Sequence, residues 1–98
     1  MSQESSQPTR EPLTLDLSGA FARRTDFSGA NLQDANLSEA DLTNAILRNA
    51  NLRGANLKGT ILRGADLRNV RNLTKDQLEE AVIDGHTLLP DYLVREGE

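Results

Sequence analysis

A repeat with a period of five residues runs from residue 15 to residue 69, and it constrains the fold more than any other feature of the sequence. Each unit reads Ala, then Asp or Asn, then Leu, then two variable residues. Six units keep this pattern strictly, and five more follow it loosely in the same register. We predict that the central residues of the units form the structural core, and from the third unit onward they are Phe27, Leu32, Leu37, Leu42, Leu47, Leu52, Leu57, Leu62 and Leu67.

The period excludes a continuous helix and a straight strand. On an α-helix, five residues advance about 140° beyond a full turn, so the leucines would spiral around the helix and form no buried stripe. On a strand, an odd period would place successive leucines on opposite faces. The sequence instead predicts short extended pieces, each with its Ala and Leu on one side, separated by corners. Gly and Asn, which tolerate a positive φ, occupy the corner position at Gly19, Gly29, Asn44, Asn49, Gly54, Gly59, Gly64 and Asn69.

A chain that turns the same way after every unit forms a coil, with Ala and Leu inside and the other side chains outside. The Ala, Asp or Asn, Leu pattern of residues 15–69 resembles the pentapeptide-repeat family. The resemblance implies an all-β solenoid, a right-handed quadrilateral β-helix in which four units make one coil of twenty residues. The eleven units would then form about three coils, each rising about 4.8 Å, with a capping α-helix at the C-terminal end.

The composition along the chain predicts three segments. Residues 1–12 are polar and contain two prolines, and we expect a flexible leader because they have too little apolar surface to offset the entropy of ordering. Residues 13–72 are expected to form the repeat β-helix, with order beginning near Leu13. Residues 73–98 are expected to form a C-terminal helical cap and tail.

A helix signal follows the repeat. Thr74 is predicted to be the N-cap and Gln77 its capping-box partner, with Leu73 and Leu78 as a hydrophobic staple. We expect the helix to span residues 75–83 and to cover the end of the coil, which would otherwise expose core leucines and unpaired backbone. Three further leucines would complete this cover: Leu88, Leu89 and Leu93.

The N-terminal end of the repeat carries no such signal, so we expect the first coil to be bare there. In its second unit, Ala22 stands where Leu is expected and Phe21 takes the outward position. We interpret Leu15, Leu17 and Phe21 as a possible interaction end for a protein partner. That partner would be a second copy that meets it end to end or a preceding repeat protein that continues the coil.

The charges are unevenly distributed along the repeat. Residues 25–44 carry four acidic side chains and no Lys or Arg, whereas residues 45–64 carry four cations and no acid. We expect these acidic and basic coils to pair within the molecule. The cations would form a ring spread over four sides and offer no contiguous basic face, and the formal net charge is −4, so no nucleic-acid partner is expected. The four cations are Arg48, Arg53, Lys58 and Arg63.

No motif for catalysis, cofactor binding or metal binding is present, so we expect neither an enzyme nor a cofactor. The sequence has no Cys, and its one histidine, His86, lies without metal-ligand spacing to other residues and is interpreted as a surface turn residue. The outward Asp and Asn side chains are expected to bond the backbone or a neighbour. No apolar run approaches the length of a membrane span and no signal peptide is visible, so we expect a cytoplasmic protein without a membrane partner.

Two functions fit these expectations. The first is a non-catalytic structural or protein-interaction module. The second is a DNA mimic that modulates a type II topoisomerase, because some members of the family that the chain resembles protect such enzymes with an acidic rod. A rod of about 13 Å, in which a basic coil follows the acidic one, argues against mimicry.

Overall fold

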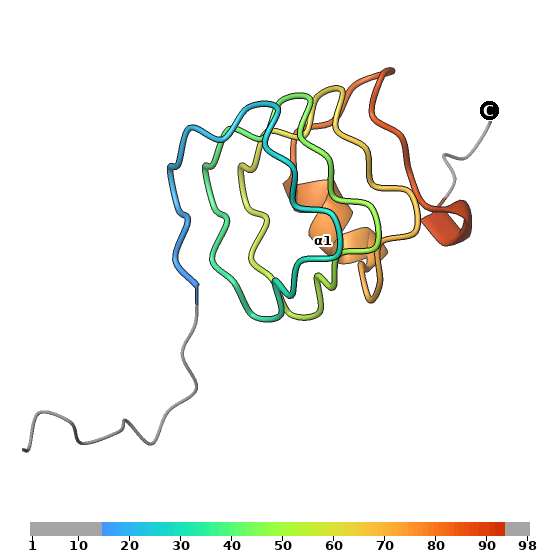
Figure 1. Ribbon diagram of the computed structural model, residues 1–98, viewed down its shortest axis with the longest axis horizontal. Helices are drawn as coiled ribbons and strands as arrows, with labels where there is room; N and C mark the ends of the chain where they lie inside the picture. The colour runs from blue at the N-terminus through green and yellow to red at the C-terminus, as the bar shows by residue number, and fades with distance from the viewer. Residues whose placement is uncertain (1–14, 94–98) are drawn as a thin grey trace, which may run out of the picture.

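The computed structural model describes residues 15–93, in which the chain winds repeatedly around one axis (Figure 1). Successive turns lie side by side along this axis, from the blue N-terminal turn to the orange C-terminal part. The helical elements of this part of the chain are α1, an α-helix at Lys75–Glu80, and η2, a 3-10 helix at Asp91–Leu93. The extended residues pair through isolated parallel bridges, because each side of the coil bends again after one unit.

The register between successive turns is twenty residues. The backbone N–H of Asn36 donates to the carbonyl of Leu15 at 2.8 Å, and the N–H of Leu17 donates to the carbonyl of Asn36 at 2.8 Å. The bridges recur every five residues, so four units complete one turn before the chain returns to the same side. This is the register expected of a four-sided coil. The bridges from the first turn to the second are Asp16–Asn36, Phe21–Asp41, Asp26–Ile46 and Asn31–Asn51.

The corners of the coil are made by residues with a positive φ, between 61° and 72°. At the first corner, the N–H of Ala20 closes the turn by donating to the carbonyl of Leu17 at 3.0 Å. The eight corners with Gly or Asn agree with the sequence pattern. Arg24, Asp34 and Glu39 take the same conformation at the corner position of their units, with φ of 61° to 62°, although they are neither Gly nor Asn. A side chain with a Cβ adopts this conformation at a cost of roughly 1–2 kcal/mol, which Gly avoids and Asn and Asp reduce.

Replacing Glu39 by Gly is therefore expected to stabilise the protein. Removing the Cβ relieves the left-handed corner, and the gain is partly offset by the greater freedom of Gly in the unfolded chain, leaving about 0.5–1 kcal/mol in the free energy of unfolding. Urea denaturation measures the change. Glu39→Gln is the matched control, because it removes the charge and keeps the strained backbone. A Gly variant no more stable than the Gln variant would contradict the prediction.

The inside of the coil is apolar and closely packed. The central leucines from Leu32 to Leu67 are at most 2% exposed. Phe27 is only partly buried, because it belongs to the first turn and no described turn lies below it. Thr60 stands at an inward Ala position and is fully buried, and its hydroxyl donates to the carbonyl of Leu37 at 2.7 Å. The one buried hydroxyl of this turn thus has a hydrogen-bond acceptor.

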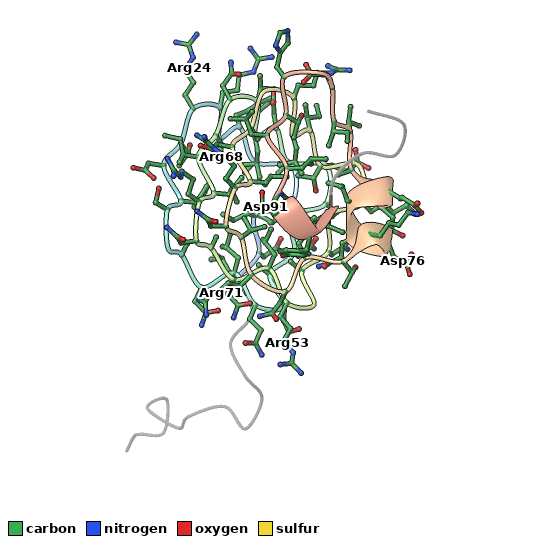
Figure 2. All side chains as sticks on the ribbon, turned by 90° about the vertical axis from the view of Figure 1, so that its right-hand side faces the viewer. Arg24, Arg53, Arg68, Arg71, Asp76 and Asp91 are labelled. Atoms are coloured by element: carbon green, nitrogen blue, oxygen red, sulfur yellow. The ribbon has the colours of Figure 1, made fainter. Side chains whose placement is uncertain are left out.

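The segment after residue 72 continues along the path of a further turn with a changed register. Ile61 bridges Val82, twenty-one residues on, and Asp66 bridges Leu88, twenty-two residues on. α1 takes the place of one side of this turn and contributes the buried Leu78 to the core cluster. Figure 1 and the view along the coil in Figure 2 place α1 at the side of the coil, and Figure 2 places η2 near the middle of its C-terminal end.

α1 is shorter than the helix predicted at residues 75–83. It ends at Glu80 because Ala81 is extended, with φ −93° and ψ 165°, and Val82 pairs with the preceding turn. The N–H of Val82 donates to the carbonyl of Thr60 at 2.8 Å, and its carbonyl accepts from the N–H of Leu62 at 2.7 Å. Hydrogen bonding to the coil thus replaces the helical bonds that the local spacing of apolar residues had indicated.

The predicted cover of three leucines is wrong at one position. Leu88 bridges Asp66, which turns its side chain outward and leaves it 43% exposed. Leu89 and Leu93 are partly buried against the core, and Pro90 is buried. Leu88 faces outward because its segment pairs with the preceding turn, and a residue bridged to an outward residue also points outward. Leu13, the predicted leader at residues 1–12 and the tail after residue 93 lie outside the described residues.

Candidate functional site

Residues 15–93 contain no group of three or more His, Asp or Glu side chains that could hold a metal ion. His86 is exposed in a turn, where its backbone N–H donates to Asp84 Oδ1 at 2.9 Å. None of the helices in the described part of the chain is long and apolar enough to cross a membrane.

The outward Asp and Asn side chains stabilise the corners. In eight units, the Oδ1 atom of this side chain accepts a hydrogen bond of 2.9–3.1 Å from the backbone N–H two residues later. This local turn satisfies a backbone donor that no ladder bond uses. The side chains therefore have a structural role at Asp16, Asp26, Asn31, Asn36, Asp41, Asn51, Asn56 and Asp66.

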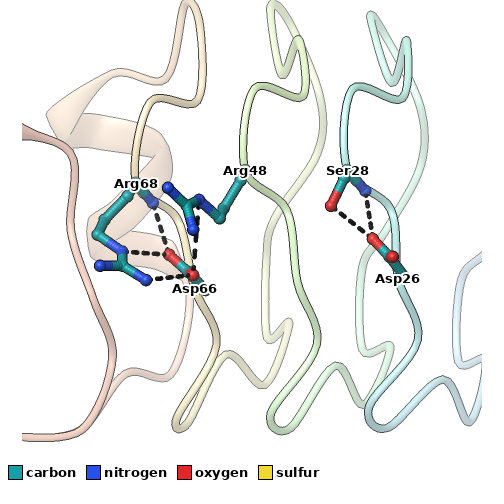
Figure 3. Close-up of polar contacts among 5 residues, drawn as sticks. All are labelled: Asp26, Ser28, Arg48, Asp66 and Arg68. Carbon is teal, nitrogen blue, oxygen red and sulfur yellow. Dashed lines mark hydrogen bonds and ion pairs between the residues drawn. The ribbon is translucent and has the colours of Figure 1, made fainter.

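Hydroxyl groups reinforce several of these carboxylates. The hydroxyl and the backbone N–H of Ser28 both donate to Asp26 Oδ1, at 2.5 and 2.9 Å (Figure 3). Both bonds lower the pKa of Asp26, and the bond from the hydroxyl has the larger effect. Ser18 lowers the pKa of Asp16 in the same way. Hydrogen bonds to the ionised form favour that form.

Asp41 has the strongest set of donors. The Thr43 hydroxyl donates to Oδ1 at 2.6 Å, and Arg23 Nε donates to Oδ2 at 2.8 Å. The Thr43 hydroxyl, followed by Arg23, holds the pKa of Asp41 at about 2, below its ordinary value of 3.8. The carboxylate also fixes the Arg23 side chain beside the exposed Phe21, to which Asp41 is bridged.

The Asp41 charge is expected to make stability depend on pH. Its folded-state pKa is lowered, so the stabilisation is present above the unfolded value of 3.8 and is lost as the pH falls through about 2. Above about pH 4 the wild type should resist urea better than Asp41→Asn, which keeps the acceptor of the corner turn, and this advantage should disappear between about pH 4 and pH 2. In an Arg23→Met background the advantage should be smaller at neutral pH. A difference that stays constant down to pH 2 would contradict the assignment.

A second carboxylate, Asp66, binds two arginines on one side of the coil (Figure 3). Arg68 approaches it with Nε at 2.9 Å from Oδ1 and Nη2 at 2.8 Å from Oδ2, and Arg48 Nε lies 3.9 Å from Oδ2. The Arg68 hydrogen bonds lower the pKa of Asp66 although burial opposes this shift, and Asp66 in turn raises the pKa of Arg68.

The acidic and basic coils do not pair as predicted. Within the described residues, no ion pair joins residues 45–64 to the acids of residues 25–44; the observed pairs join Arg23 to Asp41, and Arg48 and Arg68 to Asp66. The reason is the position of each charge within the unit. The cations directly follow the central Leu, and the residues twenty positions before them are uncharged: Ser28, Gln33, Ser38 and Thr43. The acids of residues 25–44 instead occupy outward or corner positions. They therefore stack on outward or corner residues of the next turn and not on the cations.

The two residues of the capping box, the N-cap Thr74 and its partner Gln77, have more contacts than the motif predicts. Thr74 Oγ1 accepts from the Gln77 N–H at 3.1 Å, and Gln77 Oε1 accepts from the Thr74 N–H at 2.8 Å. Gln77 Nε2 also donates to the carbonyls of Leu52 and Ala55, at 2.8 and 2.9 Å. Tyr92, which the sequence did not single out, donates from its hydroxyl to the Val70 carbonyl at 2.8 Å. No local signal could have revealed these long-range bonds.

The predicted interaction end separates into two features. Leu15 and Leu17 occupy inward positions of the first turn, where Leu15 is 47% exposed and Leu17 is partly buried. Phe21 instead occupies an outward position and is 93% exposed. Leu15 and Leu17 therefore belong to the N-terminal end of the core, and Phe21 belongs to the side of the coil.

Comparisons with known proteins agree with this architecture. The sequence matches the family described as pentapeptide repeats, with eight copies, over residues 15–49 and 35–71. No curated protein matches. Among solved structures, a pentapeptide repeat protein (Rfr23) from the cyanobacterium Cyanothece 51142 is 36% identical and superposes with a TM-score of 0.63 over 76% of this chain. The chain spans about half of that protein, 53% of its length. The fold of this neighbour supports a right-handed quadrilateral β-helix. Because the family match extends from residue 15 to residue 71, over more than half of the 98 residues, the chain belongs to the pentapeptide-repeat family.

Proposed function

We propose that this chain is a non-catalytic module that binds protein through the N-terminal end of its coil, and that its partner there is a second copy. In this proposal residues 15–72 form about three coils, and residues 73–93 close the C-terminal end. The observation that carries the proposal is the contrast between the first turn and the second at equivalent positions.

The apolar residues of the first turn are less covered than their counterparts in the second. Leu15 is 47% exposed, whereas Ala35, twenty residues on, is fully buried. The same contrast holds along the turn: the first-turn residues are partly buried, and those twenty positions later are at most 1% exposed. The partly buried residues are Leu17, Ala20, Ala22, Phe27 and Ala30.

Some backbone groups at this end are also without a hydrogen-bond partner within residues 15–93. The N–H groups of Asn36, Asp41, Ile46 and Asn51 each donate to a carbonyl of the first turn, but the equivalent groups of the first turn have no acceptor in the described part of the chain. An unpaired edge beside apolar surface favours association with another chain. Because each copy presents both donors and acceptors, two copies can meet around a two-fold axis and pair antiparallel.

Sedimentation velocity of the full chain tests this proposal. The wild type should sediment as a dimer at high concentration, and Leu15→Lys should convert it to a monomer, because two buried ammonium groups would face each other across the axis. Leu88→Lys is a matched control: Leu88 is 43% exposed, close to the 47% of Leu15, but lies toward the other end of the coil, and this variant should remain dimeric.

A monomeric wild type at high concentration would overturn the two-fold contact. If Leu15→Lys were then no more soluble than the wild type, the residues preceding Leu15 or a continuing repeat protein would be the better explanation for the end of the coil.

A DNA mimic that modulates a type II topoisomerase is the alternative function. A mimic needs acidic groups in a continuous stripe, since DNA carries one negative charge per about 1.7 Å of its axis. Here Arg48 and Arg68 lie on the same side as Asp26 and Asp66, and the charge along that side alternates in sign. We therefore expect no inhibition in a gyrase supercoiling assay with the purified chain, and inhibition there would favour mimicry.

A further inference from the structure

We propose a second binding site on the side of the coil, formed by Phe21 and Arg24, that takes an acidic protein segment carrying an apolar anchor residue. This inference does not rest on the end-to-end contact, because Phe21 projects from an outward position and is exposed in the single chain.

The unit at residues 20–24 departs from the repeat at three positions at once. Its outward residue is Phe21, which cannot accept the corner hydrogen bond that Asp or Asn provides in eight other units. Its central residue is Ala22 in place of Leu, so it fills less of the core. Its corner residue is Arg24, with φ 61° where Gly or Asn is favoured. Each departure works against the fold, and departures of this kind concentrate where a protein binds something.

The exposure of Phe21 is unlike that of the other outward apolar residues. Phe21 is 93% exposed, whereas Ile46 is 36% and Leu88 is 43% exposed. A solvated aromatic ring contributes nothing to the core and is the type of side chain that anchors protein contacts. The ring is this exposed although Asp41, the residue bridged to Phe21, holds Arg23 through a 2.8 Å ion pair.

The same unit carries one cation without an ion pair in the described part of the chain. Asp41 is matched by Arg23, while Arg24 forms no ion pair within residues 15–93 and points away from the body of the coil in Figure 2. The four side chains Phe21, Arg23, Arg24 and Asp41 thus present an apolar ring with one unmatched cation. A complementary partner offers an apolar side chain for Phe21 and a carboxylate for Arg24, which can bind it with two parallel hydrogen bonds. A nucleic acid fits less well, because a phosphate chain needs several cations in a row and stacked aromatic residues.

Selection of displayed random peptides on the immobilised full chain tests the site. Peptides that combine acidic residues with an apolar residue should be enriched. A synthetic peptide of the enriched sequence, followed by fluorescence anisotropy, should bind about tenfold or more weakly to Phe21→Ser and to Arg24→Gly. The urea midpoints of both variants should equal or exceed that of the wild type, because each removes a feature that opposes the fold. Loss of binding in a protein of unchanged or higher stability cannot come from unfolding.

Two controls make the test specific. Glu39→Gly relieves a left-handed corner on another side of the coil, so it should raise stability as Arg24→Gly does and leave peptide binding unchanged. Leu15→Lys, which breaks the proposed dimer, should also leave peptide binding unchanged. Failure of dimerisation and failure of this site are therefore measured separately.

Three results would overturn the proposal. The first is the absence of acidic peptides from the enriched pool. The second is an enriched peptide that binds Phe21→Ser and Arg24→Gly as tightly as the wild type. The third is a single-stranded oligothymidylate that binds with the same dependence on Phe21 and Arg24 and displaces the peptide, which would identify a nucleic-acid site.

Discussion

Replacing Leu52 by Ala is expected to lower the free energy of unfolding by about 2–5 kcal/mol. Leu52 is 1% exposed and belongs to the core cluster together with Leu32, twenty residues before it, and Leu73. The surrounding turns are held at a fixed spacing by backbone hydrogen bonds, so they cannot collapse to fill the space that the Leu side chain leaves. Urea denaturation of the two proteins measures the difference.

The neighbouring outward residue provides the control. Asn51 Oδ1 accepts from the N–H of Arg53 at 3.1 Å and from Asn72 Nδ2 at 2.8 Å. Both bonds are exposed, so Asn51→Ala should cost only about 1 kcal/mol. Equal losses at the two adjacent positions would mean that the assignment of inward and outward residues is wrong.

Deleting residues 74–98 is expected to give a protein that aggregates or forms large oligomers. The deletion removes the acceptors of three backbone N–H groups in the preceding turn: Gly59 bonds Glu80, Leu62 bonds Val82, and Leu67 bonds Leu88, at 2.7–2.9 Å. It also removes Leu78, Leu89 and Leu93, which pack against the core cluster. The truncated coil would expose an unpaired edge and apolar surface together. Size-exclusion chromatography with light scattering measures the outcome.

A single substitution gives a graded form of the same experiment. Leu78→Asp places a carboxylate at a position that is 9% exposed and should destabilise the protein strongly, whereas Glu79→Ala changes an exposed residue of the same helix and should change stability little. A truncated chain that stays soluble and monomeric with an unchanged β signal in circular dichroism would show that residues 74–98 do not close the coil.

Much of the coil can be predicted from the sequence because the structure of each unit depends on a few consecutive residues. Ala and Leu lie two residues apart, so an extended piece turns both inward wherever it occurs, and the burial of Leu32 to Leu67 agrees with this at every unit. The capping box of α1 is equally local, because its two hydrogen bonds join residues three positions apart. Such features depend little on the rest of the chain.

Other features depend on what lies one turn away. The three corners at Arg24, Asp34 and Glu39 carry residues that adopt a positive φ less readily than Gly, and they adopt it because the hydrogen bonds to the next turn fix the corners on both sides. The partners of the arginines could not be read from blocks of like charge, because pairing depends on the position within the unit as well as on the turn. The unusual exposure of Phe21 can likewise be recognised only when it is compared with the exposure of the other outward residues in the structure.

The sequence by itself thus determined the period, the inward and outward positions and the start of α1, because these are set by the geometry of a few consecutive residues. Only the tertiary structure decided where α1 ends, which way Leu88 faces and which carboxylates hold Arg23 and Arg68. In the first two cases the reason is physical competition: hydrogen bonds from Val82 and Leu88 to the preceding turn outweigh the helical and apolar preferences of their own neighbours. For the arginines, the stacking of turns sets the distance between charges that are close in space and distant in the chain.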